Sequence, residues 1–251
     1  MQLGLVVTAS AAAWQQYVVR ADGPYTVYLP HLETPPEPTP EPTPEPTPEP
    51  TPEPTPEPTD GWLLGPATGT AEQAIAWLSD RSNSYTTHDI GLIVSAYRDW
   101  GDVCGVDWFL ALAQSAHETG SLTSWWCQRP RRNPAGLGVT GKILPGTPDS
   151  SPGPAWAWDG LQWREGLSFN EWATESVPAH LGRLLAYALP AGSGTSYQQS
   201  LIDYTLGLRA LPEHYRGVAR SIIDLNGRWA YPGTSYGQSI IDLRERMAGR
   251  R

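Results

Sequence analysis

A single glutamate, Glu118, stands near the end of a segment whose residue types favour a buried helix. The segment begins at Asp107, which can cap a helix by accepting hydrogen bonds from its first free amides, and ends at Gly120, which can close it in the left-handed conformation. Burial and the negative end of the helix dipole both raise the pKa of a carboxyl group at such a place. Glu118 therefore has the properties of a general acid, although a glutamate at a frayed, exposed helix end is an open alternative.

The sequence around Glu118 resembles the bacterial glucosaminidase family of peptidoglycan hydrolases. Residues 113–120 read AQSAHETG, and residues 133–138 read NPAGLG after a short loop. The family reads A-Q-A-x-x-E-[ST]-G followed by N-x-[FA]-G-[IL]-x-G. The resemblance covers residues 70–248 and is specific at these two motifs. It implies an endo-β-N-acetylglucosaminidase of the flagellar and autolysin type, a glycoside hydrolase on a lysozyme-like helical fold, with Glu118 as the catalytic acid.

A second carboxyl group is expected, because most glycosidases protonate the leaving oxygen with one acid and stabilise the sugar cation with another. The resemblance implies that this acid lies on a hairpin lobe. Asp159, in the sequence Trp-Asp-Gly, is the first candidate, followed by Glu165 and Glu171. If none of them serves, the acetamido group of the substrate can act as the nucleophile.

Sugar contacts are expected from the glycine-rich turn and from aromatic side chains, because an indole offers a wide apolar face with a polar edge. The chain has 12 Trp residues, and burial in the core is the alternative for each of them. At Trp229 the family usually has a tyrosine, so Tyr231 or Tyr236 is expected to supply the hydroxyl. The predicted substrate-binding residues are Asn133, Gly136, Leu137, Trp158, Trp229, Tyr231 and Tyr236.

The elements that must position these residues are mainly helices. Capping signals and apolar stripes at helical spacing predict helices near 70–79, from Thr87 onward, over 107–120, and from Thr174. His180, in the last of these, is expected to be a packed or capping side chain, with a general base as the alternative. Further helices are predicted near 196–209, 213–225 and 235–248. Residues 121–172 lack helical periodicity and predict loops with a small hairpin. The predicted fold is a mainly α domain with a small β-hairpin lobe, preceded by an extended proline-rich linker.

Composition divides the chain into three parts. Residues 1–34 begin with an apolar, signal-like stretch that lacks a basic leading region, and residues 35–60 repeat Pro-Glu-Pro-Thr, which excludes helix and sheet. Nine of the 26 acidic residues but only one of the 17 basic residues precede residue 61. The predicted catalytic domain, 61–251, is therefore almost neutral despite the net charge of −9, and offers no footprint for nucleic acid.

The remaining expectations concern the surroundings of the chain. Cys104 and Cys127 flank the helix that carries Glu118 and are a candidate disulfide, with two free thiols as the alternative. No cofactor, metal or transmembrane segment is expected. We expect a secreted, cell-wall-associated monomer whose partner is peptidoglycan or a related aminosugar polymer. A lytic transglycosylase and a wall-binding module without catalysis are the alternative functions.

Overall fold

The computed structural model describes residues 60–250. The signal-like segment 1–34 lies outside the described residues, as does the Pro-Glu-Pro-Thr linker apart from its last residue, Asp60. Six α-helices and a small three-stranded sheet make up the regular structure of the described part, so the predicted mainly α fold is confirmed. These helices are α1 (Ala71–Ser79), α2 (Thr87–Cys104), α3 (Trp108–Thr119), α4 (Val177–Ala188), α5 (Ser196–Leu208) and α6 (Tyr236–Met247).

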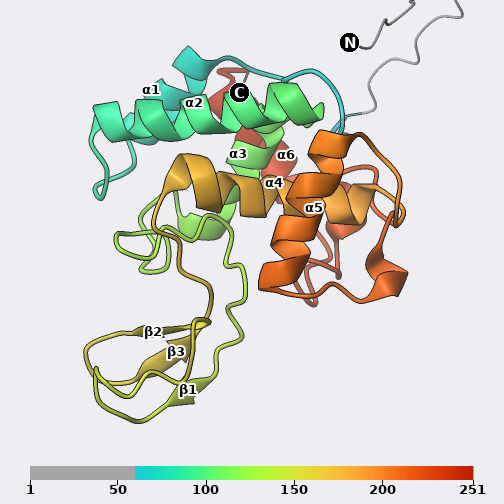
Figure 1. The fold of residues 1–251 in the computed structure, drawn as a ribbon. Helices are drawn as coiled ribbons and strands as arrows, with labels where there is room; N and C mark the ends of the chain where they lie inside the picture. The colour runs from blue at the N-terminus through green and yellow to red at the C-terminus, as the bar shows by residue number, and fades with distance from the viewer. Residues whose placement is uncertain (1–59, 251) are drawn as a thin grey trace, which may run out of the picture. The chain divides into compact units, whose positions relative to one another are not determined.

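The helix α3 lies in the middle of the domain (Figure 1), where it packs against α2 and α6. Every residue from Trp108 to Ala116 is buried. The Asp107 side chain accepts hydrogen bonds from the amides of Phe109 and Leu110, and Gly120 ends the helix with φ 58°. Both predicted caps are therefore confirmed. Because the cap and the burial fix its position, α3 is a rigid support for the residues at its end.

A three-stranded antiparallel sheet forms a separate lobe below the helices in Figure 1. Its strands are β1 (Ile143–Leu144), β2 (Trp156–Trp158) and β3 (Trp163–Glu165), in the order β1-β3-β2. The tight turn between β2 and β3 pairs Trp158 with Trp163. The predicted hairpin within 121–172 is confirmed. The chain returns from this lobe through a π-helix, Trp172–Ser176, that leads directly into α4.

The prediction of a helix at 213–225 is wrong. Only two short 3-10 turns form there, Glu213–Tyr215 and Ile223–Leu225. Between them the chain pairs with the start of the domain. The amide of Leu63 donates to the carbonyl of Arg220 at 2.9 Å, and the amide of Ile222 donates to the carbonyl of Gly61 at 2.8 Å. These long-range backbone bonds replace the helical ones that local sequence favours.

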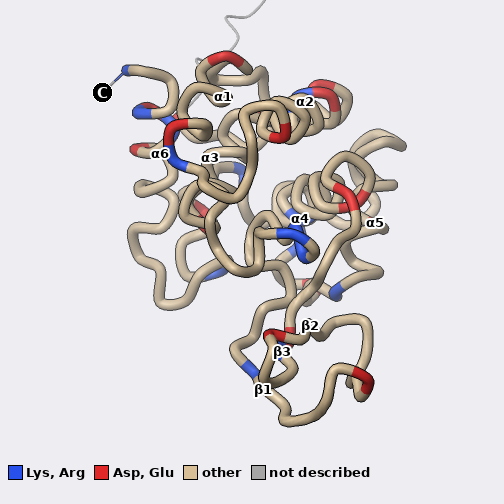
Figure 2. The backbone as a smooth tube through the Cα atoms, turned by 90° about the vertical axis from the view of Figure 1, so that its left-hand side faces the viewer, with Lys and Arg blue, Asp and Glu red and all other residues tan. Residues whose placement is uncertain are grey.

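Charged residues of both signs are interspersed along the helices and the sheet lobe (Figure 2). Within 60–250, every helix is too short or too polar to cross a membrane.

Candidate active site

The carboxyl group of Glu118 lies at the end of α3 and is half-buried. The hydroxyl of Tyr236, the first residue of α6, donates a hydrogen bond to its Oε1 at 2.5 Å. The side chain of Trp229 also hydrogen-bonds to it. Burial raises the pKa of Glu118, while these two hydrogen bonds act against that rise, and the net shift is upward. A carboxyl group in this setting can carry a proton at a pH where an exposed glutamate has lost it.

The glycine-rich loop lies against the same carboxyl group. The hydroxyl of Ser115, on α3, donates to the carbonyl of Pro134 at 2.8 Å, which ties the loop to the helix. At Gly136, where φ is +62°, an added Cβ atom would lie 4.0 Å from Oε2 of Glu118. The loop therefore approaches Glu118 through a residue that has no side chain, which leaves room beside the acid.

The side chain of Asn133, a predicted substrate-binding residue, is fully buried. Its Nδ2 donates to the carbonyls of Leu137 and Leu167 at 2.8 and 2.9 Å, and its Oδ1 accepts from the amide of Leu137 at 2.8 Å. These bonds fasten the glycine-rich loop to the chain that leaves β3. Through these hydrogen bonds Asn133 fixes the shape of the loop.

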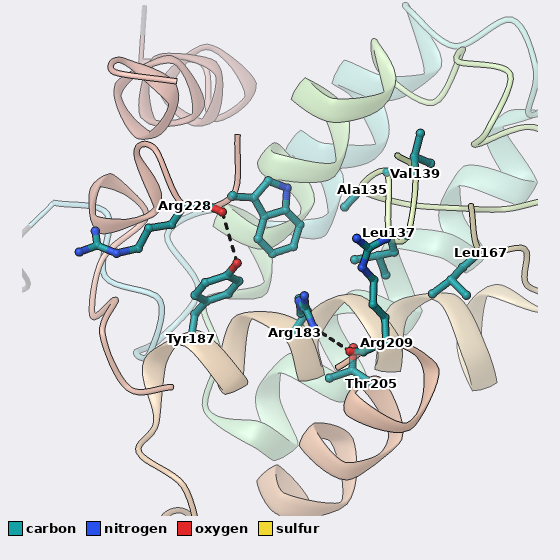
Figure 3. Close-up of a pocket in the computed structure, with 12 residues that line it drawn as sticks. Ala135, Leu137, Val139, Leu167, Arg183, Tyr187, Thr205, Arg209 and Arg228 are labelled. Atoms are coloured by element: carbon teal, nitrogen blue, oxygen red, sulfur yellow. Dashed lines mark hydrogen bonds between the residues drawn. The ribbon is translucent and has the colours of Figure 1, made fainter. Parts of the chain in front are cut away.

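A pocket of about 220 Å³ lies close to Glu118, which is not itself part of the lining shown in Figure 3. Two of its lining residues, Gly136 and Trp229, are also neighbours of the Glu118 carboxyl group. The predicted substrate-binding residue Leu137 also lines the pocket. The full lining consists of Ala135, Gly136, Leu137, Gly138, Val139, Leu167, Arg183, Tyr187, Thr205, Arg209, Arg228 and Trp229.

A chain of buried hydrogen bonds leads to Glu118 from the interior. Nε2 of Gln114 donates to the Tyr236 hydroxyl at 2.7 Å, so its Oε1 is left to accept from Nε2 of His180 at 3.0 Å. Nδ1 of His180 must then accept from the hydroxyl of Tyr97, at 2.8 Å. Each donor in this chain points toward Glu118. Gln114 and His180 are fully buried, as is Tyr97.

His180 is neutral in this chain, because burial lowers its pKa to about 3. The prediction that His180 packs inside the domain is confirmed by its complete burial. Its link to the acid was not predicted. The partners come from four helices and are separated by 66 to 122 positions, so no local pattern marks them.

Asp159 lies in the turn between β2 and β3, where its carboxylate is held inside its own hairpin. Its Oδ1 accepts from the amides of Leu161 and Gln162 at 2.9 and 2.8 Å, and its Oδ2 accepts from Nε of Arg164 at 2.6 Å. The backbone bonds, followed by Arg164, lower the pKa of Asp159 to about 2. These are the contacts of a residue that stabilises a turn.

Glu165 lies at the end of β3, from which the chain continues to the pocket residue Leu167. Its carboxylate accepts a hydrogen bond from the hydroxyl of Thr140 and lies 3.6 Å from Nζ of Lys142. These two partners lower its pKa, and the pocket residue Arg209 also contributes. Glu165 is therefore an ionised carboxylate at neutral pH. Glu171, by contrast, is an exposed residue at the start of the π-helix.

The four aromatic residues predicted to bind substrate lie in different parts of the domain. Tyr236 supplies the hydroxyl at Glu118, whereas Tyr231 is 92% exposed. Trp229 is half-buried in the pocket wall. Trp158 lies in the sheet lobe, where its ring packs on Trp163 with 5.5 Å between centroids.

The candidate disulfide is not formed in this structure, since Cys104 and Cys127 are two free, buried cysteines. Burial raises their pKa values to about 11 and about 12, so both are protonated thiols at neutral pH. Among residues 60–250, no group of three or more His, Cys, Asp or Glu side chains is arranged to hold a metal ion.

No family profile and no curated protein matches the sequence. Among solved structures, the catalytic domain of the autolysin Auto from Listeria monocytogenes matches over 72% of this chain and 98% of that one. The two are 17% identical, with a TM-score of 0.36. At this TM-score the likeness is too loose to establish a shared fold.

Proposed function

We propose that this chain hydrolyses the β-1,4 glycosidic bond after N-acetylglucosamine in peptidoglycan, with Glu118 as general acid. One observation carries the proposal: Glu118 is a half-buried carboxyl group with a raised pKa, and it lies against Gly136, a residue without a side chain that also lines the neighbouring pocket. The sequence resemblance of residues 113–120 and 133–138 to the glucosaminidases supports the substrate class. The same resemblance supports a secreted, wall-associated enzyme.

In the proposed reaction, Glu118 transfers its proton to the leaving oxygen of the glycosidic bond. Burial raises the pKa of Glu118, so a larger fraction of it carries this proton near neutral pH. As the proton leaves, negative charge develops on the carboxylate, and the donors Tyr236 and Trp229 stabilise it. The pocket wall at Trp229 offers an aromatic surface for a sugar ring.

For the second carboxylate we propose Glu165 in place of Asp159. The lowered pKa of Glu165 keeps it ionised, as a nucleophile or a general base requires, and Arg209 connects it electrostatically to the pocket. The carboxylate of Asp159 already accepts two backbone bonds and an arginine bond. A separation of roughly 5 Å between the two carboxyl groups in the substrate complex predicts retention, and roughly 6.5 to 9.5 Å predicts inversion.

The products of digestion test the proposal. Purified peptidoglycan is incubated with the wild-type chain, and the soluble fragments are identified by mass spectrometry. We expect fragments with reducing N-acetylglucosamine ends. Anhydro-muramyl ends would instead identify a lytic transglycosylase. Binding to the wall without release of soluble fragments would identify a wall-binding module and contradict both enzymatic proposals.

A further inference from the structure

The pocket beside Glu118 is lined by arginines and by no acidic residue. Arg183 comes from α4, Arg209 follows the last residue of α5, and Arg228 precedes Trp229. In Figure 3 the side chain of Arg209 extends toward Leu137 and that of Arg183 bonds to the Arg209 carbonyl, whereas the Arg228 side chain points away from the pocket. Two positive charges therefore face the cavity.

Arg183 is held in place by the protein itself. Its Nη1 donates to the carbonyl of Arg209 at 2.9 Å, and its Nη2 reaches the carbonyl of Ala210 at 3.5 Å. Its guanidinium carbon lies 5.8 Å from the ring centroid of Tyr187. These contacts fasten the end of α5 to α4 and fix the half-buried Arg183 in the pocket wall. Little further ordering is needed for Arg183 to meet a ligand.

The charge of this pair is not neutralised by the protein. Among the ion pairs within residues 60–250, none involves Arg183 or Arg209. Burial and the neighbouring Arg209 both lower the pKa of Arg183, as expected where two like charges share one wall. Glu165, which interacts electrostatically with Arg209, is already bonded to Thr140 and paired with Lys142. An anion in the pocket would relieve this repulsion.

Building on the proposed function, we propose that Arg183 and Arg209 bind a carboxylate of the substrate next to the bond that is cleaved. A guanidinium group matches a carboxylate with two parallel hydrogen bonds, which adds both affinity and orientation. Peptidoglycan offers two sources of this group: the lactyl ether of N-acetylmuramic acid once its peptide is removed, and the peptide stem itself. Chitin, with the same β-1,4 linkage, offers none. The pair therefore selects wall glycan over neutral aminosugar polymers.

Three soluble substrates separate these sources: a chitin oligosaccharide, a peptide-free glycan of N-acetylglucosamine and N-acetylmuramic acid, and the same glycan with peptide stems. For Arg209→Gln we expect kcat/KM on a carboxylated substrate to fall by about 10- to 100-fold more than on the chitin oligosaccharide. The measured quantity is the ratio of kcat/KM on the carboxylated substrate to kcat/KM on the chitin oligosaccharide, because any effect of Arg209 on Glu165 acts on all substrates alike. Arg220→Gln, which removes an exposed arginine outside the pocket, should leave the ratio unchanged.

A loss on both glycans identifies the lactyl carboxylate, and a loss confined to the peptide-bearing glycan identifies the stem. Equal losses on all three substrates, or no loss on any, would overturn the inference. Dissociation constants measured in a Glu118→Gln background give the same comparison without turnover. If the wild type cleaves none of the substrates, the proposed function fails, while the binding comparison still decides whether Arg209 selects carboxylates.

Discussion

The hydroxyl of Tyr236 donates to Oε1 of Glu118 at 2.5 Å and joins the start of α6 to the end of α3. Burial and the charge of Glu118 hold the pKa of Tyr236 well above 10, so the phenol keeps its proton and remains a donor. Nε2 of Gln114 donates a hydrogen bond to the hydroxyl oxygen of Tyr236. Tyr236 is thus oriented on one side and directs its proton toward the acid on the other.

Replacing Glu118 by Gln removes the proton donor while preserving the shape of the side chain. We expect the rate of wall lysis to fall by roughly 10²- to 10⁴-fold, the usual contribution of a general acid. The measurement is release of soluble fragments, with circular dichroism to verify folding. The exposed Glu213→Gln variant, which has the same change of charge, should retain full activity. Wild-type lysis by Glu118→Gln would exclude Glu118 as the acid.

Replacing Tyr236 by Phe should raise the pKa of Glu118, because the Tyr236 hydrogen bond lowers it. A general acid works only while protonated, so activity falls as pH rises through its pKa. The basic limb of the pH–rate profile should therefore move to higher pH in the variant, with a lower maximum. Tyr231→Phe, at a 92% exposed position, is the matched control. A basic limb that stays at the wild-type pH would show that Tyr236 does not set the pKa of the acid.

His180 should make the protein less stable in acid. Its pKa is about 3 in the folded chain and close to 6.5 when unfolded, so between these values the unfolded state binds more protons. The stability that its neutral form supports is present above pH 6.5 and is lost as pH falls toward 3. Between pH 6.5 and 4.5 this amounts to about 2–3 kcal/mol.

Urea unfolding at several pH values tests this prediction. His180→Gln should be less stable at neutral pH but should lose less stability on acidification than the wild type. In the wild type, the NMR resonances of the His180 imidazole should keep the chemical shifts of the neutral ring down to pH 4.5. If the stabilities of the two proteins depend on pH in the same way, or if His180 of the wild type titrates near pH 6.5, His180 is not held neutral by burial.

The two candidates for the second carboxylate are separated by a pair of isosteric variants. Glu165→Gln should reduce kcat by roughly 100-fold or more, as loss of a catalytic carboxylate does. Asp159→Asn should weaken the hairpin, since it loses the charge that meets Arg164, with only a small change in kcat. The thermal midpoint and kcat of both variants give the comparison. The reverse pattern would return the role to Asp159.

Both thiols should be inert while the domain is folded. The pKa values of Cys104 and Cys127 are raised to about 11 and about 12, and both are buried. Without reductant, iodoacetamide at pH 8 should modify neither cysteine in the native chain and both in urea, as read by mass. A chain that resists modification even in urea would contain the disulfide after all.

Local sequence predicted what local bonds decide. Asp107 begins α3 and Gly120 ends it, because a cap needs hydrogen bonds only to its own neighbours in the chain. The segment 213–225 has equally helical residues, but its amides and carbonyls pair with residues 61–63, which no local rule foresees.

The candidate site also has one part that sequence motifs predict and one part that only tertiary packing creates. Glu118 and Gly136 belong to motifs that can be read directly. Asn133 belongs to the same motif, but sequence could not reveal that it lies beneath the loop. Tyr97 and His180 reach the acid only through packing of helices far apart in the sequence.

The series of buried hydrogen bonds couples Glu118 to four of the helices. Tyr97 stands on α2, Gln114 on α3, His180 on α4 and Tyr236 on α6, so four helices each supply one link. A slight shift of any of these helices would lengthen a bond in the series and alter the proton affinity at its far end. Catalysis in this protein should therefore report on the integrity of its interior, and fail during gentle heating before the helices melt.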